Sequence, residues 1–150
     1  METRLLEKKI KSLSKIFLDT AIFIYFLEEN SKWINLVLPI FQLAEKKEVN
    51  LVTSSITALE VITGYKKQKR QDLVKSFWEM LEDFEIEILD FEKKYVEKAA
   101  QLRADLNLRT PDAIQLSLAI KNKISAFATN DAKLKKVKEI KIFYLGDYVK

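Results

Sequence analysis

Short apolar runs that alternate with helical stretches constrain the fold of this chain more than any other feature. Five runs have the length of strands: Lys15–Leu18, Leu51–Thr53, Glu85–Leu89, Ser125–Thr129 and Ile140–Leu145. The run at 85–89 alternates between polar and apolar residues, which predicts an edge strand with one wet face. Because strands separated by helices pair in parallel, the pattern predicts an α/β fold. We expect a mainly parallel central sheet of four to five strands with helices on both faces.

Three of the helical stretches carry features that affect the path of the chain. Residues 1–14 place leucine and isoleucine at helical spacing among lysines, which predicts a short amphipathic extension before the main fold. Pro39 interrupts another stretch and marks a kink or a break. Thr57 and Glu60 have the spacing of a capping box, which predicts a helix that opens there and stops near Gly64.

Composition limits both the number of domains and the possible chemistry. A chain of 150 residues with 48% hydrophobic side chains suffices for one core, so we expect residues 1–150 to form a single domain. The absence of histidine and cysteine excludes Ser-His-Asp and Cys-His catalysis, disulfides and Cys/His zinc sites. Two glycines are too few for a dinucleotide-binding loop or a P-loop. The net charge of +4 permits a polyanionic partner.

The apolar run Ile16–Leu27 is similar in composition to a signal or membrane segment but lacks the other properties of one. Asp19 interrupts the run, and Glu28 and Glu29 follow it without a small-residue cleavage site. The run is also too short to span a bilayer. The sequence therefore predicts a cytoplasmic protein that is not associated with a membrane.

Four acids occupy related positions at the expected edge of the sheet. Asp19 and Asp131 each follow a predicted strand, and Glu60 and Asp112 each fall in the first turn of a predicted helix. The helix that contains Asp112 is predicted to begin with Thr110 as its N-cap. Functional groups gather where parallel strands end and helices begin, so we expect all four carboxylates to face one crevice.

Each acid also has a structural explanation of its own. Glu60 can complete a capping box and Asp112 can complement a helix dipole, while the two others can cap or close turns. Together, four converging carboxylates would repel one another by on the order of 4 kcal/mol per close pair at an effective dielectric constant of 20. A shared proton is one way to relieve this repulsion. A divalent cation is a better one, and oxygen ligands without histidine or cysteine suit Mg²⁺ or Mn²⁺.

Four segments, in their order and spacing, carry a resemblance to a known family. They are Phe17-Leu18-Asp19-Thr20, Ser54-Ser55-Ile56-Thr57-Ala58-Leu59-Glu60, Pro111-Asp112-Ala113-Ile114-Gln115-Leu116-Ser117-Leu118-Ala119 and Thr129-Asn130-Asp131. In these segments the chain resembles the PIN domain, and most closely the VapC-type toxin ribonucleases of VapBC toxin–antitoxin pairs. The resemblance implies a metal-dependent endoribonuclease, with RNA as substrate, a small antitoxin as partner and a homodimeric assembly.

The resemblance also implies roles for individual residues. Thr129 would orient a carboxylate or a water. Ala21 departs from the family, which often carries a polar residue there, and residues 1–14 are longer than a compact domain of this type needs. The acids that would hold Mg²⁺ or Mn²⁺ are Asp19, Glu60, Asp112 and Asp131.

The implied mechanism is metal-assisted hydrolysis of a phosphodiester, in which metal-bound water attacks and no side-chain base is needed. An acidic centre repels RNA, so basic residues around it must supply the attraction. A solvated face is the alternative explanation for each lysine. The candidates for RNA binding are Arg109, Lys66, Lys67, Lys69 and Arg70, with Lys133, Lys135 and Lys136 behind them.

Other functions remain open at this point. A PIN-like module that binds nucleic acid or protein without cutting it is one alternative, although all four acids are present. A structure-specific DNA nuclease would use the same carboxylates. A receiver-type phosphoacceptor would need a lysine at the end of the last central strand, where 143–145 has none. Phe77, Trp78 and Leu81 belong either to the core or to an interface between subunits.

Overall fold

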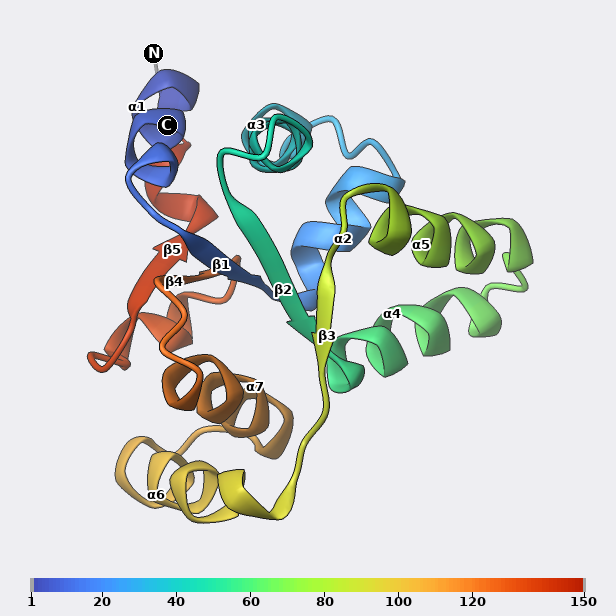
Figure 1. Cartoon of the computed structure of the whole chain (residues 1–150). Coiled ribbons are helices and arrows are strands. Elements are labelled where there is room, and N and C mark those ends of the chain that lie inside the picture. The colour runs from blue at the N-terminus through green and yellow to red at the C-terminus, as the bar shows by residue number, and fades with distance from the viewer. Residues whose placement is uncertain (1, 150) are drawn as a thin grey trace.

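One sheet of five parallel strands forms the centre of the molecule (Figure 1), in a computed structural model that describes residues 2–149. The strands lie in the order β3-β2-β1-β4-β5, and every neighbouring pair is parallel. This confirms the predicted α/β class and the parallel sheet. The strands are β1 (Lys15–Leu18), β2 (Asn50–Ser54), β3 (Glu87–Leu89), β4 (Ala126–Thr129) and β5 (Lys141–Tyr144).

Helices cover both faces of this sheet, as the sequence predicts. Ile16 and Leu18 of β1 point into a core shared with α1 to α5, whereas Phe17 between them points into a core shared with α6 and α7. Within residues 2–149, no helix combines the length and the apolar character needed to cross a membrane. The helices are α1 (Glu2–Lys11), α2 (Thr20–Leu27), α3 (Ile34–Glu45), α4 (Ser55–Lys67), α5 (Gln71–Asp83), α6 (Val96–Leu106) and α7 (Thr110–Lys121), with short 3-10 turns η1 (Lys93–Tyr95), η2 (Ala132–Lys136) and η3 (Leu145–Tyr148).

The strand order reverses between β1 and β4. The chain builds β2 and β3 on one side of β1 and then crosses over to build β4 and β5 on the other side. The backbone N–H of Asp19 donates to the carbonyl of Ala128 at 3.0 Å, so β1 and β4 stay joined up to the end of β1. In open α/β sheets, ligands bind outside the carboxyl ends of the strands at such a reversal.

Helix α4 differs from its predicted form at both ends. It begins at Ser55, and the Oγ of Ser54 caps it by accepting a hydrogen bond from the N–H of Thr57 at 3.0 Å. The expected capping box between Thr57 and Glu60 is therefore wrong. Gly64 lies inside the helix, which continues to Lys67, because a glycine in a helix interior costs only about 1 kcal/mol.

Helix α1 forms where the sequence predicts an amphipathic helix, and α3 is continuous through Pro39. Leu6 and Ile10 of α1 are fully buried in the core with α3, so the predicted N-terminal extension contributes side chains to the hydrophobic core. Pro39 lies within a continuous α3, so of the two expected alternatives, a kink or a break, the break does not occur.

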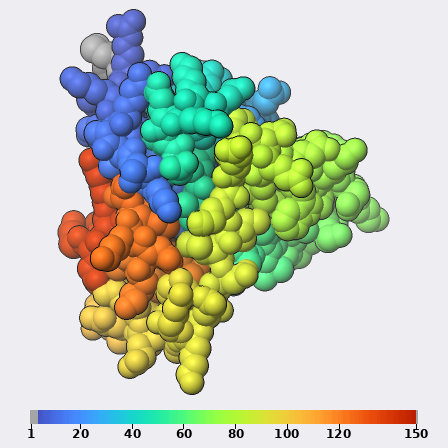
Figure 2. Space-filling view, viewed as in Figure 1, coloured from blue at the N-terminus to red at the C-terminus, as the bar shows by residue number. Residues whose placement is uncertain are grey.

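Helices α4 and α5 pair as a hairpin that projects from the sheet, and in the space-filling view they form a lobe on the right of the molecule (Figure 2). Phe77 and Leu81 of α5 are buried in the core that α1 to α5 share on one face of the sheet, whereas Trp78 is 46% exposed. The structure therefore assigns Phe77 and Leu81 to the core and leaves Trp78 at the surface.

Candidate active site

Asp19 stands at the carboxyl end of β1 and is the N-cap of α2. Its Oδ1 accepts a hydrogen bond from the N–H of Thr20 at 2.8 Å, which satisfies one of the free donors at the start of the helix. Its Oδ2 accepts a hydrogen bond from the Oγ1 of Thr129 at 2.7 Å, across from the end of β4. Both oxygens of Asp19, at the end of β1, are thus held by donors from α2 and from the end of β4.

Asp112 enters from the start of α7 and is almost fully buried. The helix begins at Thr110 with Arg109 as N-cap, so the predicted capping role of Thr110 is wrong by one residue. Arg109 makes no side-chain cap. Instead its Nε donates to Asp112 Oδ2 at 3.2 Å, which places a positive charge beside the acid.

Glu60 lies in the second turn of α4, one turn later than predicted. Its Oε1 accepts a hydrogen bond from Thr20 Oγ1 at 3.2 Å. This contact ties the side chain to the start of α2, directly beside Asp19.

Asp131 follows β4 and caps η2 through its Oδ1, which accepts a hydrogen bond from the N–H of Lys133 at 3.0 Å. The N–H of Asp131 donates in turn to Thr129 Oγ1 at 3.1 Å. Thr129 is fully buried and therefore links Asp131 to Asp19 through one hydroxyl.

These side chains line a cavity of about 270 Å³ at the reversal of the sheet. The cavity brings together all four acids singled out in the sequence, with Thr129 and one of the basic candidates, Arg109. Ala21, Ile24 and Tyr25 of α2 form its apolar wall. The lining is Asp19, Thr20, Ala21, Ile24, Tyr25, Glu60, Arg109, Asp112, Thr129, Asn130 and Asp131.

The other basic candidates do not line the cavity. The cluster at Lys66, Lys67, Lys69 and Arg70 lies at the far end of α4, in the turn that leads to α5. Arg70 forms an ion pair with Asp72 at 2.8 Å. The lysines Lys133, Lys135 and Lys136 follow Asp131 in η2, where Lys135 forms an ion pair with Asp147.

Gln115 and Thr57 also belong to the site, although sequence reasoning missed them as functional residues. Gln115 is buried, and its Nε2 lies 3.4 Å from both Asp19 Oδ1 and Glu60 Oε1. Thr57 is buried and donates from Oγ1 to Gln115 Oε1. Gln115 lies one turn after Asp112 and Thr57 one turn before Glu60, so each shares a helix face with a candidate acid. No local pattern shows that the two side chains meet.

Burial and mutual repulsion disfavour the charged forms of Asp19 and Glu60. Burial raises the pKa of Asp19, and the nearby charge of Asp112 raises it as well, against the opposing hydrogen bonds from Thr129 and Thr20. Burial also raises the pKa of Glu60, as do the charges of Asp19 and Asp112. Neutralisation by a cation or by a proton would relieve both effects.

The donor set fits a hard cation that keeps part of its water shell. Within residues 2–149, no three acidic side chains are grouped so that they could hold one metal ion by themselves. Mg²⁺ retains several waters and takes one or two carboxylates directly, so oxygen ligands spread around one cavity suit it. The chain has no histidine or cysteine to favour a softer metal.

The raised pKa values predict how the metal-free protein responds to pH. Between the ordinary values of 3.8 for Asp19 and 4.5 for Glu60 and their raised folded values, the folded state binds more protons than the unfolded state. The contribution of these two groups to the free energy of unfolding therefore decreases as pH rises. We expect an Asp19→Asn, Glu60→Gln double variant to gain stability relative to wild type as the pH rises above these ordinary values, measured by urea unfolding in EDTA. An equal pH dependence in both proteins would contradict this prediction.

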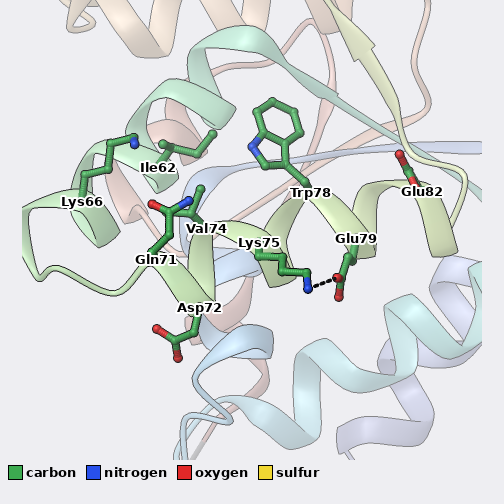
Figure 3. A pocket seen from close by; sticks show the side chains of 9 residues that line it. All are labelled: Ile62, Lys66, Gln71, Asp72, Val74, Lys75, Trp78, Glu79 and Glu82. Atoms are coloured by element: carbon green, nitrogen blue, oxygen red, sulfur yellow. Dashed lines mark ion pairs between the residues drawn. The ribbon is translucent and has the colours of Figure 1, made fainter.

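A larger groove lies away from the acids, between α4 and α5 (Figure 3). Its volume is about 810 Å³. Ile62, Val74 and Trp78 form its apolar part, and Lys75 pairs with Glu79 at 3.8 Å along its side. The acids in its lining, Asp72, Glu79 and Glu82, are all exposed, and the first two form ion pairs with Arg70 and Lys75. The smaller cavity, whose acids are partly or almost fully buried, is therefore the better candidate for chemistry.

Comparison with known proteins gives one family and a set of related folds. A model of the PIN domain family matches residues 16–140. No curated protein matches the chain. The matched segment starts after α1, so this helix lies outside the part of the chain that the family model describes.

Several solved structures are similar to the chain at identities that show the fold alone. The crystal structure of VapBC2 from Rickettsia felis, bound to a DNA fragment from their promoter, gives a TM-score of 0.69 at 22% identity over 85% of this chain and 96% of that chain. A toxin–antitoxin complex from Klebsiella pneumoniae gives 0.63 at 21% identity over 83% and 94%. VapC20 from Mycobacterium tuberculosis, a toxin that cleaves the sarcin-ricin loop, gives 0.65 at 14% identity over 84% and 98%.

Proposed function

The chain belongs to the PIN domain family, and from this premise we propose that it is a metal-dependent endoribonuclease, the toxin of a toxin–antitoxin pair. The observation that carries the proposal is the cavity at the strand reversal, which is lined by Asp19, Glu60, Asp112 and Asp131. Four carboxylates in one cavity disfavour an apolar ligand. The cavity is suited to a divalent cation and to the phosphate oxygens that the cation attracts.

In the proposed mechanism, Asp19, Glu60, Asp112 and Asp131 would hold Mg²⁺ or Mn²⁺, one or two of them directly and the others through waters that such an ion retains. A bound ion of this kind activates water and stabilises charge on a phosphodiester. Thr129 keeps Asp19 in place through its hydroxyl, and Asp131 lies beside it on the same strand end. Arg109 pairs with Asp112 and, among the side chains of residues 2–149, is the one basic group that lines the cavity, so it is positioned to receive a phosphate as well.

The proposal includes partners. The similar structure from Klebsiella pneumoniae is a toxin–antitoxin complex, and the one from Rickettsia felis is VapBC2 bound to promoter DNA. Both support a small antitoxin as the partner of this chain. We also propose a cytoplasmic homodimer that acts on RNA. Light scattering coupled to size exclusion tests the dimer, and a monomer at all concentrations would remove it.

The experiment that tests the function is cleavage of a mixed RNA pool by the purified protein with Mn²⁺ or Mg²⁺. EDTA and an Asp112→Asn variant serve as controls against a contaminating nuclease. We expect cutting that disappears in both controls. A folded protein that binds metal and cuts DNA but not RNA would indicate a DNA nuclease, and one that cuts neither would indicate a binding module.

Arg109 should contribute more to RNA binding than the cluster at the end of α4. We expect Arg109→Gln to weaken RNA affinity and to lower its dependence on salt, because one fewer phosphate contact releases one fewer counterion. Lys67→Gln is the matched control, since it removes a charge that lies outside the cavity. Filter binding between 50 and 200 mM salt measures the affinity and its salt dependence. Loss of one phosphate contact should lower the slope of log affinity against log salt concentration by ~0.7. Equal losses of RNA affinity in the two variants would contradict this prediction and would indicate that RNA also contacts the turn between α4 and α5.

A further inference from the structure

Gln115 touches two of the four acids at once. Its Nε2 lies 3.4 Å from Asp19 Oδ1 and 3.4 Å from Glu60 Oε1, and the side chain is 1% exposed. Asp19 comes from the end of β1 and Glu60 from α4, so no stretch of local sequence holds them together. A single amide group from α7 therefore bridges two carboxylates that would otherwise repel each other.

Thr57 determines which end of this amide faces the acids. Its hydroxyl donates to Gln115 Oε1, an atom that can only accept. The Nε2 group is then turned toward the carboxylates. Thr57 is itself fully buried, and its N–H donates to Ser54 Oγ at 3.0 Å, so the start of α4 fixes the whole arrangement.

The chemistry of an amide suits this position better than that of a charged side chain. A lysine would also donate to both carboxylates, but its positive charge would oppose the binding of a cation a few ångströms away. A glutamate would add a further negative charge to a cluster that already repels itself. An amide donates two hydrogen bonds without a net charge, and therefore steadies the pair without competing with the ion.

We propose that Gln115, oriented by Thr57, is a positioning residue that holds Asp19 and Glu60 in the arrangement in which they bind the divalent cation. This inference rests on the proposed function, because it concerns the metal of the same site. Gln115 contacts the carboxylates and acts through them. Partners of this kind typically change metal affinity by about 10- to 100-fold when they are removed.

The test is a titration of the purified, metal-free protein with Mn²⁺. Calorimetry measures the binding, and electron paramagnetic resonance measures the ion that remains free. We expect Gln115→Leu to weaken Mn²⁺ binding by about 10- to 100-fold. Ser117→Ala is the matched control, because Ser117 is a fully buried polar residue of the same helix. Its hydroxyl bonds Ile114 O within the helix at 2.6 Å.

The Thr57 variants keep the inference testable if Gln115→Leu does not fold. Thr57→Val should weaken Mn²⁺ binding in the same direction, whereas Thr57→Ser keeps the hydroxyl and should restore most of the wild-type affinity. In RNA cleavage, both Gln115→Leu and Thr57→Val should lose rate at limiting Mn²⁺ and recover at saturating Mn²⁺, with KM for RNA unchanged. A purely structural role would lower thermal stability and leave the Mn²⁺ affinity unchanged.

Failure of the inference can be distinguished from failure of the proposed function. If the wild type binds Mn²⁺ and cuts RNA while Gln115→Leu and Thr57→Val bind Mn²⁺ equally well, Gln115 is not a positioning residue and the function stands. If the wild type itself neither binds Mn²⁺ nor cuts RNA, the proposed function fails and the inference is overturned with it.

Discussion

Asp19→Asn is expected to abolish both RNA cleavage and the stabilisation of the protein by metal. Asp19 is the acid most tightly held in the site, with hydrogen bonds to both oxygens from Thr20 and Thr129. An asparagine keeps the shape and the Oδ1 acceptor but removes the charge that a cation needs. We expect cleavage to fall by on the order of 10²- to 10³-fold or more, the loss typical when one group that stabilises transition-state charge is removed.

The effect on stability should have opposite signs with and without metal. Wild type in Mn²⁺ at 100 times its dissociation constant gains about 2.7 kcal/mol, or roughly 5 to 10 °C in melting temperature for a chain of this size. Asp19→Asn should show little of this gain. In EDTA at neutral pH the variant should be at least as stable as wild type, because burial raises the pKa of Asp19 and the charged form is disfavoured there.

Differential scanning fluorimetry with and without Mn²⁺ measures both effects. Asp72→Asn is the control, since Asp72 is an exposed acid that pairs with Arg70 outside the cavity. The control should respond to Mn²⁺ like the wild type. Equal metal-induced shifts in Asp19→Asn and wild type would show that Asp19 does not share the metal site.

Leu6→Ala is expected to cause a large loss of stability although Leu6 does not line the cavity. Leu6 is fully buried, and it packs in the same core as α3 and the sheet. Truncating a buried leucine leaves a cavity and costs about 2 to 5 kcal/mol. That is a large fraction of the stability of an ordinary domain, roughly 5 to 15 kcal/mol in total.

Leu5 provides a control of the same residue type one position away. It is 49% exposed, so Leu5→Ala should change the free energy of unfolding by only about 0.5 kcal/mol or less. Urea unfolding midpoints of the two variants make the comparison. Similar midpoints for Leu5→Ala and Leu6→Ala would mean that α1 is a dispensable addition to the fold, as its place outside the family match would allow.

Much of the fold could be predicted because it depends on local pattern. A strand or helix reveals itself by the period with which apolar side chains recur, and all five strands lie where the sequence placed them. The parallel sheet follows from strands alternating with helices. The boundaries of α4 were predicted less well, because Ser54 and Thr57 are both good caps and only the packing of β2 decides which of them serves.

The site was predicted in part for the same reason. Asp19, Asp112 and Asp131 stand at element ends, and element ends at the carboxyl edge of a parallel sheet must converge. The role of Gln115 depends on a contact between α7 and α4, which no local pattern encodes. The sequence predicted that the lysines near the end of α4 lie around the acidic centre. They do not line the cavity, because α4 extends away from the sheet and carries them with it.

The sequence by itself limited the chemistry open to this protein, because it lacks histidine and cysteine, and it set four acids in an order that a parallel sheet brings to one edge. The tertiary structure alone decided which of the remaining polar groups serve those acids. Gln115 bridges Asp19 and Glu60, and Leu6 closes the core from a helix outside the family match. The physical reason is that charge and periodicity are properties of single residues and short segments, whereas burial and hydrogen bonding between distant elements exist only after the chain has packed.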